Sequence, residues 1–458
     1  MKTIQLLFVL HLTICIGVLC SAQQKRWTIE ECVSHALKNN ISIKQSELDI
    51  KSNGLDKLAA IGNFLPSVNF GGTHSWNIGL NQNITTGLLE NQTTQFTSAS
   101  LSSNITIYNG LQNINRLHRT KLAQLAAQYQ LTKMQDDISL FVANAFLDIL
   151  FNKENLKVQQ LQLANDQKQL VRAQELVDAG SVPRGDLFDM KATIASDNQK
   201  VIIAENALLL SKLSLAQALQ LQDFENFDIA DVAVEANLSP LMAEKSETIV
   251  DKAKQVRSEI KIAKTNLDVA LRDIKIAKGA YKPSLTGFYS FSTRASYSSR
   301  IVGIDPSGVP ILASPLPLFD QFSDNKGHNF GLQISIPVLN GLGVKTNVAR
   351  SKLNYERSKI ALNQANLDLE ANVYKAISDA KGALKTYESS MATLEARQEA
   401  FNYAKERFNV GMMNAFDFNQ SQTVFVAAQS DLIRSKYDYI FKVKVVELYF
   451  GIPIIQKK

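Results

Sequence analysis

The sequence carries the same ordered motifs twice, and this duplication constrains the fold more than any other feature. Asn109-Gly110-Leu111 recurs as Asn340-Gly341-Leu342, 231 positions later. Upstream, Phe64-Leu65-Pro66-Ser67 recurs as Tyr281-Lys282-Pro283-Ser284 at a shorter offset of 217. The second copy therefore carries a longer insert between its proline and its Asn-Gly-Leu motif. A repeat of this length predicts one body built from two similar halves.

The first residues have the pattern of a secretory signal. Lys2 precedes an apolar run over residues 4–19, and Cys20-Ser21-Ala22 supplies the small residues of a cleavage site. We predict a signal peptide over residues 1–22. A lipid anchor at Cys15 or Cys20 is the alternative, although neither cysteine follows the Gly or Ala that a lipoprotein signal requires.

Charge, cysteine and histidine content exclude several function classes. The formal net charge of +6 is spread without basic clusters, so we expect no nucleic-acid partner. The mature chain keeps one cysteine, Cys32, which excludes an intrachain disulfide and is interpreted as a small apolar residue on a short helix. The histidines lack metal-ligand spacing. We therefore expect no metal, no cofactor and no enzymatic activity.

Long segments without proline or glycine predict two helical hairpins. They cover residues 111–178, 186–222, 344–410 (with Gly382 alone) and 412–450. A helix of about 68 residues would be roughly 100 Å long, so these helices must pack side by side as coiled coils. In the turns between them, Gly180 and Gly411 are expected to be left-handed, and Asp186 and Asp417 are predicted to cap the returning helices.

Four other segments alternate between apolar and small polar residues with a period of two. They are predicted as strands over about 66–81, 96–108, 283–300 and 327–338. This pattern is typical of a transmembrane β-barrel, and the signal peptide favours that interpretation over a soluble sandwich. After the signal we find no apolar stretch long enough for a transmembrane helix.

Four strands cannot close a barrel, because about eight are the practical minimum. An open edge in lipid would leave backbone groups without hydrogen-bond partners. We therefore expect several copies to share one cylinder. The run Gly341-Leu342-Gly343-Val344-Lys345-Thr346 lacks the spacing of a phosphate-binding loop and is interpreted as a strand-to-helix junction.

The ordered set of motifs resembles the TolC-like outer-membrane efflux proteins. The closest single motif is Arg407-Phe408-Asn409-Val410-Gly411 with Asp417-Phe418, and its first-repeat counterpart runs from Leu176 to Leu187. The two prolines, each expected to close one helix before a strand pair, and the two Asn-Gly-Leu motifs, each expected to open a long helix, add to the resemblance. It covers the chain from Trp27 to about Pro453.

The resemblance implies an α+β membrane protein, a two-repeat protomer of long helical hairpins and four transmembrane β-strands. Three copies would form a 12-stranded β-barrel above a 12-helix α-barrel. It further implies contact with outer-membrane lipid and partnership with a periplasmic adaptor and an inner-membrane transporter. A segment from Asp223 to Pro240 would form part of a belt around the helices, together with the tail after Pro453.

The same resemblance implies two sites at the hairpin tips. The periplasmic gate would involve Asp417, Met412, Met413 and Gln420. The adaptor would contact Gly180, Ser181, Val182, Asp186, Phe408, Val410, Gly411 and Asn414. Gln420 stands where a second acidic residue is common in the family, Met413 stands in place of an arginine, and Pro183 makes the first tip unusual. These departures indicate a gate held by apolar contacts more than by ion pairs.

We place the first repeat at residues 23–240 and the second at 241–458. The helical hairpins within them span about 111–222 and 343–450, and an equatorial segment covers about 223–240. The predicted function is the outer-membrane tunnel of a tripartite efflux or type I secretion system. The alternatives are a periplasmic coiled-coil adaptor and a trimeric surface protein without transport activity.

Overall fold

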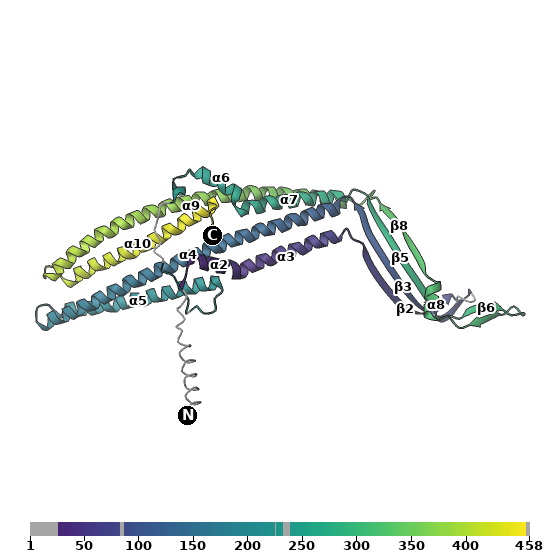
Figure 1. The fold of residues 1–458 in the computed structure, drawn as a ribbon, viewed down its shortest axis with the longest axis horizontal. Helices are drawn as coiled ribbons and strands as arrows, with labels where there is room; N and C mark the ends of the chain where they lie inside the picture. Colours follow the sequence, from purple (N-terminus) through teal and green to yellow (C-terminus); the bar gives the residue numbers. More distant parts are fainter. Residues whose placement is uncertain (1–25, 83–86, 225, 232–238, 455–458) are drawn as a thin grey trace, which may run out of the picture. The chain divides into compact units, whose positions relative to one another are not determined.

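The computed structural model describes residues 26–82, 87–224, 226–231 and 239–454 (Figure 1). The predicted signal peptide and both candidate lipidation cysteines lie outside these residues. The chain divides into two compact units, and each contains parts of both repeats. Unit 1 takes the described residues up to Asp49, Gln128–Ile262 and those from Asn363, whereas unit 2 takes Ile50–Ala127 and Ala263–Leu362.

Unit 2 contains an antiparallel sheet with the order β2-β3-β5-β8 (Figure 1). Its strands are β2 (Ser67–Gln82), β3 (Leu89–Asn109), β5 (Ser284–Ser296) and β8 (Gly327–Ser335). All four predicted strands are present, but β3 begins about seven residues earlier than expected and β5 ends before the expected 300. Within the described residues, β2 and β8 each have a single neighbour in this sheet.

The register of this sheet gathers the apolar side chains on one face. Phe70 lies opposite Leu101, and Leu101 lies opposite Phe291 on the next strand. One residue farther along, Ser100 lies opposite Ser292 and faces the other side. The apolar face is solvent-exposed in the single chain, since Phe70 and Phe330 keep 75% and 76% of their surface. The alternation of apolar and polar residues along each strand therefore gives the whole sheet one apolar face and one polar face.

The longer insert of the second repeat lies between β5 and β8, where the unequal offsets placed it. It forms the antiparallel hairpin of β6 (Arg300–Ile304) and β7 (Pro310–Ala313), followed by the short helix α8 (Leu318–Asp324).

Each Asn-Gly-Leu motif forms the junction between a strand and a long helix. Gly110 and Leu111 have φ angles of 69° and 67°, and Gly341 and Leu342 have φ angles of 57° and 68°. Helix α4 (Gln112–Asp178) begins directly after the first motif, and α9 (Gly343–Asn409) after the second. The structure therefore confirms that the glycine-rich run at Gly341 is a junction.

The four hairpin helices have matching lengths in the two repeats. Helices α4 and α9 each have 67 residues, and the returning helices α5 (Arg184–Leu219) and α10 (Ala415–Phe450) each have 36. Corresponding helices begin 231 positions apart, as the motifs do. The absence of proline and glycine thus located these helices to within a few residues.

The expectation of one helix before each proline is wrong. The first repeat has α2 (Ile29–Asn39) and α3 (Ile41–Gly62). The second has α6 (Ser246–Val256) and α7 (Ser258–Gly279), with a short 3₁₀ helix, η1 (Pro240–Ala243), before them. The breaks at Asn40 and Arg257 are 217 positions apart, and both residues are extended.

Long-range hydrogen bonds hold both breaks. The Asn40 side chain donates to the carbonyl of Ala218 over 3.0 Å. The buried Arg257 guanidinium donates to Asp136 over 3.1 Å and to Glu259 over 2.9 Å. These bonds satisfy polar side chains that the packing has taken out of water, so the bends are fixed by tertiary structure.

The apolar core of unit 1 joins α2, α4, α5 and α10 to a small parallel strand pair. This pair consists of β1 (Arg26–Trp27) and β4 (Asp228–Ile229). Phe146 of α4, Leu215 of α5 and Ile229 of β4 are among its fully buried side chains. Cys32 is also fully buried in this core, which confirms its interpretation as an apolar helix residue.

Helix α5 corrects one expectation about the membrane. By length and composition alone it is apolar enough to cross a bilayer, with a mean hydropathy of 1.3 over its most apolar stretch. One third of that stretch is buried, and Leu215 and Leu219 belong to the core of unit 1. Ile202, Ile203 and Leu210 instead lie on the exposed surface of the single chain. The helix therefore has one face packed in the core and one apolar face without cover from the described residues.

Candidate functional site

Both hairpin turns use a left-handed glycine to end the outgoing helix. Gly180 has a φ of 74°, and Ser181 N–H donates to the Leu176 carbonyl over 2.9 Å. At the second tip Gly411 has a φ of 77°, and Met412 N–H donates to the Arg407 carbonyl over 2.8 Å. These bonds satisfy carbonyls at the helix ends that would otherwise lack donors. The left-handed conformation expected for both glycines is confirmed.

The prediction that Asp186 and Asp417 cap the returning helices is wrong. The cap of α10 is Asn414, whose side chain accepts the Asp417 N–H over 2.8 Å and donates to the Asp417 carboxylate over 3.0 Å. The residue at the cap of α5 is Pro183, which makes no side-chain capping bond. Helix α5 begins at Arg184 and α10 at Ala415, so each aspartate lies in the first turn of its helix and not before it. There their charge still interacts favourably with the helix dipole.

The two tips share a cavity of about 630 Å³. Nine of the residues proposed for the gate or for adaptor contact line it: Ser181, Val182, Asp186, Phe408, Val410, Gly411, Met412, Met413 and Asn414. Gly180, Asp417 and Gln420 are not among its lining residues. Asp417 and Gln420 lie on exposed positions of α10. The structure thus brings most of the predicted tip residues into one place and separates the proposed gate acid from them.

Arg172 joins the two tips and was not predicted from the sequence. Its guanidinium donates to the Asn409 side chain over 2.9 Å and to the Asn409 carbonyl over 3.5 Å. Leu176 and Met190 extend the apolar part of the same cavity. Arg172 lies in the last turns of a 67-residue helix, where no local motif marks it.

Stacked aromatic rings hold α9 and α10 together behind the second tip. Phe408 and Phe418 stack with ring centroids 4.5 Å apart. Phe401 stacks on Phe425 at 5.1 Å and lies 5.8 Å from Phe418. Such pairs add to the stabilisation that burial alone provides. These ring contacts therefore fix α9 against α10 directly behind the exposed side chains of the second tip.

The second tip exposes apolar side chains beside polar ones. Val410, Met412 and Phe416 expose about 70% of their surface beside polar Asn409 and Asn414. Within the described residues, no group of three or more His, Cys, Asp and Glu side chains gathers as a metal site. Exposed apolar side chains with a polar rim are typical of surfaces that bind another protein.

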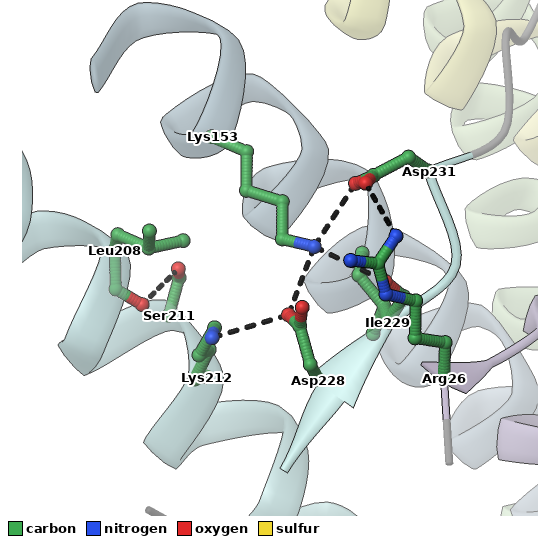
Figure 2. Close-up of polar contacts among 8 residues, drawn as sticks. All are labelled: Arg26, Lys153, Leu208, Ser211, Lys212, Asp228, Ile229 and Asp231. Atoms are coloured by element: carbon green, nitrogen blue, oxygen red, sulfur yellow. Dashed lines mark hydrogen bonds and ion pairs between the residues drawn. The ribbon is translucent and has the colours of Figure 1, made fainter. Parts of the chain in front are cut away.

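A charged network anchors the described part of the predicted belt segment (Figure 2). Lys153 of α4 pairs with Asp228 over 2.8 Å and with Asp231 over 3.0 Å, and it donates to the Ile229 carbonyl over 3.1 Å. Lys212 of α5 pairs with Asp228 over 3.1 Å, and Arg26 pairs with Asp231 over 3.1 Å. The remainder of the belt segment, residues 225 and 232–238, lies outside the described residues.

This network keeps Asp228 ionised. Burial by itself would raise the pKa of the Asp228 carboxyl, but Lys153 and Lys212 hold the pKa below its ordinary value of 3.8. The strand pair β1–β4 is thus tied to both helices of the first hairpin by charge as well as by the core.

The outer membrane efflux protein family model matches residues 32–220 and 249–447. The outer membrane protein TolC of Vibrio cholerae is 24% identical over 335 residues, which cover 70% of this chain and 69% of that protein. The outer membrane efflux protein BepC of Brucella suis is 21% identical over 421 residues, covering 90% of this chain and 83% of that protein.

The fold is shared with a solved structure, that of the Campylobacter jejuni CmeC outer membrane channel. The TM-score is 0.75 at 16% sequence identity, and the match covers 94% of this chain and 87% of that one.

Proposed function

We propose, since this chain belongs to the outer membrane efflux protein family, that three copies form the outer-membrane tunnel of a tripartite efflux or type I secretion system. The chain is an outer-membrane efflux channel protein, and its relatives include the outer membrane protein TolC and the outer membrane efflux protein BepC. A periplasmic adaptor or a surface protein without transport is not favoured, because the family match includes both repeats.

The observation that carries the proposed assembly is the sheet with one apolar face and two open edges. In a bilayer the apolar face suits lipid, but the edges β2 and β8 would leave backbone groups without partners at several kcal/mol each. If β2 of one copy pairs with β8 of the next, three copies close a barrel of twelve strands. That number lies well above the practical minimum of about eight.

The exposed apolar side of α5 supports the same assembly in the helical part. Ile202, Ile203 and Leu210 expose 64%, 60% and 55% of their surface. An exposed apolar stripe of this kind on a coiled-coil helix calls for a partner helix. We propose that the neighbouring copy supplies it, so that α4, α5, α9 and α10 of three copies form a twelve-helix barrel.

The proposed orientation follows from the sequence signal and from the chemistry of each part. The signal peptide at residues 1–22 would export the chain, the sheet would lie in outer-membrane lipid, and the helices would extend into the periplasm. The tips would then meet a periplasmic adaptor that connects to an inner-membrane transporter. The two repeats at 23–240 and 241–458 would each supply one of the two hairpins to that contact.

Conductance in planar bilayers tests the channel. The purified, detergent-solubilised protein should insert and give discrete conductance steps. Leu332→Asp places a charge on the lipid-facing side of β8, where Leu332 is exposed in the single chain, and should reduce insertion. Gln333→Asp, one residue along on the opposite face, should insert normally. No steps from the wild-type protein would contradict the proposal.

Adaptor capture tests the role of the tips. Gly180→Val and Gly411→Val force a β-branched residue into a left-handed conformation and should distort the tips without touching the sheet. We expect both to reduce co-purification of the adaptor while the trimer still forms. Gly382→Val, in the middle of α9 with open space around it, is the matched control. Equal capture by all variants would mean that the adaptor docks elsewhere.

A further inference from the structure

Helix α8 lies on the apolar face of the sheet, at the end opposite to the strand–helix junctions (Figure 1). Thr293 and Ala295 of β5 point to the same side as Phe291, because residues two positions apart on a strand share a face. Thr293 and Ala295 nevertheless keep only 5% and 0% of their surface. The Thr293 hydroxyl donates to the Phe322 carbonyl of α8 over 2.8 Å. The helix therefore covers β5 on the side that the proposed barrel turns towards lipid.

Side-chain hydrogen bonds to the β5 backbone hold this seven-residue helix in one orientation. The Gln321 amide nitrogen donates to the Ser296 carbonyl over 3.0 Å, and the amide oxygen accepts the Ser296 N–H over 2.9 Å. Asn325, at the end of α8, donates to the Arg294 carbonyl over 2.8 Å. A helix this short is not stable by itself, so its docking on β5 decides which side it exposes.

An aromatic row, made of His74, Trp76 and Tyr297, lies at the same level of this face. Ala295 lies opposite Thr97, and Thr97 lies opposite His74. The Thr97 hydroxyl is hydrogen-bonded to His74 Nδ1 over 2.7 Å and to the Tyr297 hydroxyl over 2.9 Å. Trp76 meets His74 edge-on, with ring centroids 4.4 Å apart. Tyrosine and tryptophan concentrate where the hydrocarbon of a bilayer meets its head groups, so this row suits that boundary.

The length of the apolar face below this row matches the thickness of a bilayer. Leu285 is the first β5 residue on the face, and it lies opposite Tyr108 of β3. Ala295 lies ten positions farther along β5. Ten residues of a strand span about 33 Å, or about 25 Å across a membrane at a strand tilt of about 40°. The apolar band of a transmembrane barrel is also about 25 Å tall, with aromatic residues at both edges. With Tyr108 at one edge, the aromatic row and α8 lie at the other.

Beyond the aromatic row the same face becomes mixed. On β3 it presents Thr93 and Asn91, which lie opposite Ile78 and Leu80 of β2. The apolar band of a barrel needs apolar residues on adjacent strands. The band of this sheet therefore ends at the aromatic row.

The outward side of α8 suits the head-group region of a bilayer. Phe319 keeps 80% of its surface, and its neighbours on the helix, Asp320 and Ser323, are exposed as well. Full immersion in hydrocarbon would bury the Asp320 charge, whereas a position in water would leave the Phe319 ring without apolar contact. A helix at the boundary places the ring among acyl chains and the carboxylate in water.

We propose that α8 lies in the head-group region of the outer leaflet, with Phe319 turned into the lipid. Together with the aromatic row, α8 then sets the level at which the apolar face of the barrel ends. The inference rests on the proposed barrel and adds a lipid-contacting element outside the four strands. The partner of α8 is a lipid surface, and the experiment distinguishes it from water and from a second copy of the chain.

Depth-dependent fluorescence quenching in phosphatidylcholine vesicles tests the position of α8. The full chain first loses both of its tryptophans through Trp27→Phe and Trp76→Phe. Phe319→Trp then supplies one reporter on α8, and Phe330→Trp supplies another on the apolar face of β8, in separate proteins. A quencher at the lipid head group should reduce the emission of Phe319→Trp more than a quencher at the bilayer centre does. For Phe330→Trp the order should be reversed.

Val309→Trp, in the turn of the β6–β7 hairpin, is the control and should respond to iodide in the water but to neither lipid quencher. A Phe319→Trp reporter that responds to iodide alone overturns the inference. So does one that responds to no quencher, which would mean that a second copy covers α8, and one that is quenched most at the bilayer centre. In these outcomes Phe330→Trp still reports an inserted sheet. Loss of its lipid quenching would instead contradict the proposed barrel and this inference together.

Discussion

Asp186 and Asp417 occupy equivalent positions in the two repeats but have different neighbours. Asp417 accepts a hydrogen bond from the capping Asn414, whereas the first tip has Pro183 at that place. Asp186 also borders the tip cavity, while Asp417 lies on an exposed position of α10. The two carboxylates are therefore suited to different surroundings in an assembly, and the pair provides its own control.

Asp417→Asn is the first prediction at this scale. If threefold symmetry brings three copies of Asp417 to a narrow entrance, their charges favour cations, and a multivalent cation can lodge there and block. The variant should then lower cation selectivity and blunt block in planar bilayers, with α10 intact because asparagine still accepts from Asn414. Asp186→Asn should do markedly less. Equal effects, or none from either, would place the gate elsewhere, for example at Met412 and Met413.

Gly110 and Gly341 give a second matched pair. Both are left-handed, but a Cβ at Gly110 would clash with the Gly279 carbonyl oxygen, whereas one at Gly341 would meet nothing within 4 Å. Gly341→Ala should therefore cost only the strain of the left-handed conformation, about 1–2 kcal/mol. Gly110→Ala must also displace backbone and should lower the midpoint of thermal unfolding by clearly more. Similar midpoints for the two variants would contradict this account of the first junction.

At the scale of elements, the sequence predicted what local chemistry decides. Helices α4 and α9 were visible because neither proline nor more than one glycine interrupts them, and the sheet was visible because its faces alternate along each strand. The breaks at Asn40 and Arg257 were not visible. Their partners Ala218 and Asp136 lie more than 100 positions away, and neither break uses proline or glycine.

At the hairpin tips, too, the sequence predicted features that depend on local chemistry and missed those that depend on tertiary packing. The left-handed glycines and most of the cavity lining were predictable from the turn motifs. The capping roles were assigned wrongly, because α5 begins at Arg184 and α10 at Ala415. Asp186 and Asp417 therefore lie inside the first turn of their helices and not at the capping position before it. Arg172 was missed because its contact with Asn409 exists only once the two hairpins have packed together.

Lys153→Gln tests the charged anchor of the β1–β4 pair. Asp228 would lose one of its two cations while still partly buried, so we expect a loss of about 1–3 kcal/mol in stability at pH 7. Because the folded pKa of Asp228 lies below 3.8, its stabilising contribution is complete above that pH and is lost as the pH falls through the folded pKa.

The effect of Lys153→Gln on thermal unfolding should therefore shrink in strong acid. Lys385→Gln is the control, since Lys385 pairs with Glu388 on the surface and such pairs contribute little. A loss from Lys153→Gln no larger than that from Lys385→Gln would show that the core alone holds the belt segment.

At the scale of the whole molecule, one chain is an incomplete structure for a membrane. Its sheet has an exposed apolar face and two open edges, and α5 carries an uncovered apolar face. A second and a third copy would satisfy all of these features at once. The uncovered surfaces of the single chain therefore support the assembly proposed above.

The mass of the detergent-solubilised particle, measured by native mass spectrometry, tests this claim most directly. The account predicts a heat-modifiable particle of three mature chains that dissociates only when its strand content is lost. Circular dichroism on the same sample would follow that strand content. A stable monomer that keeps its full strand content in detergent would contradict the account.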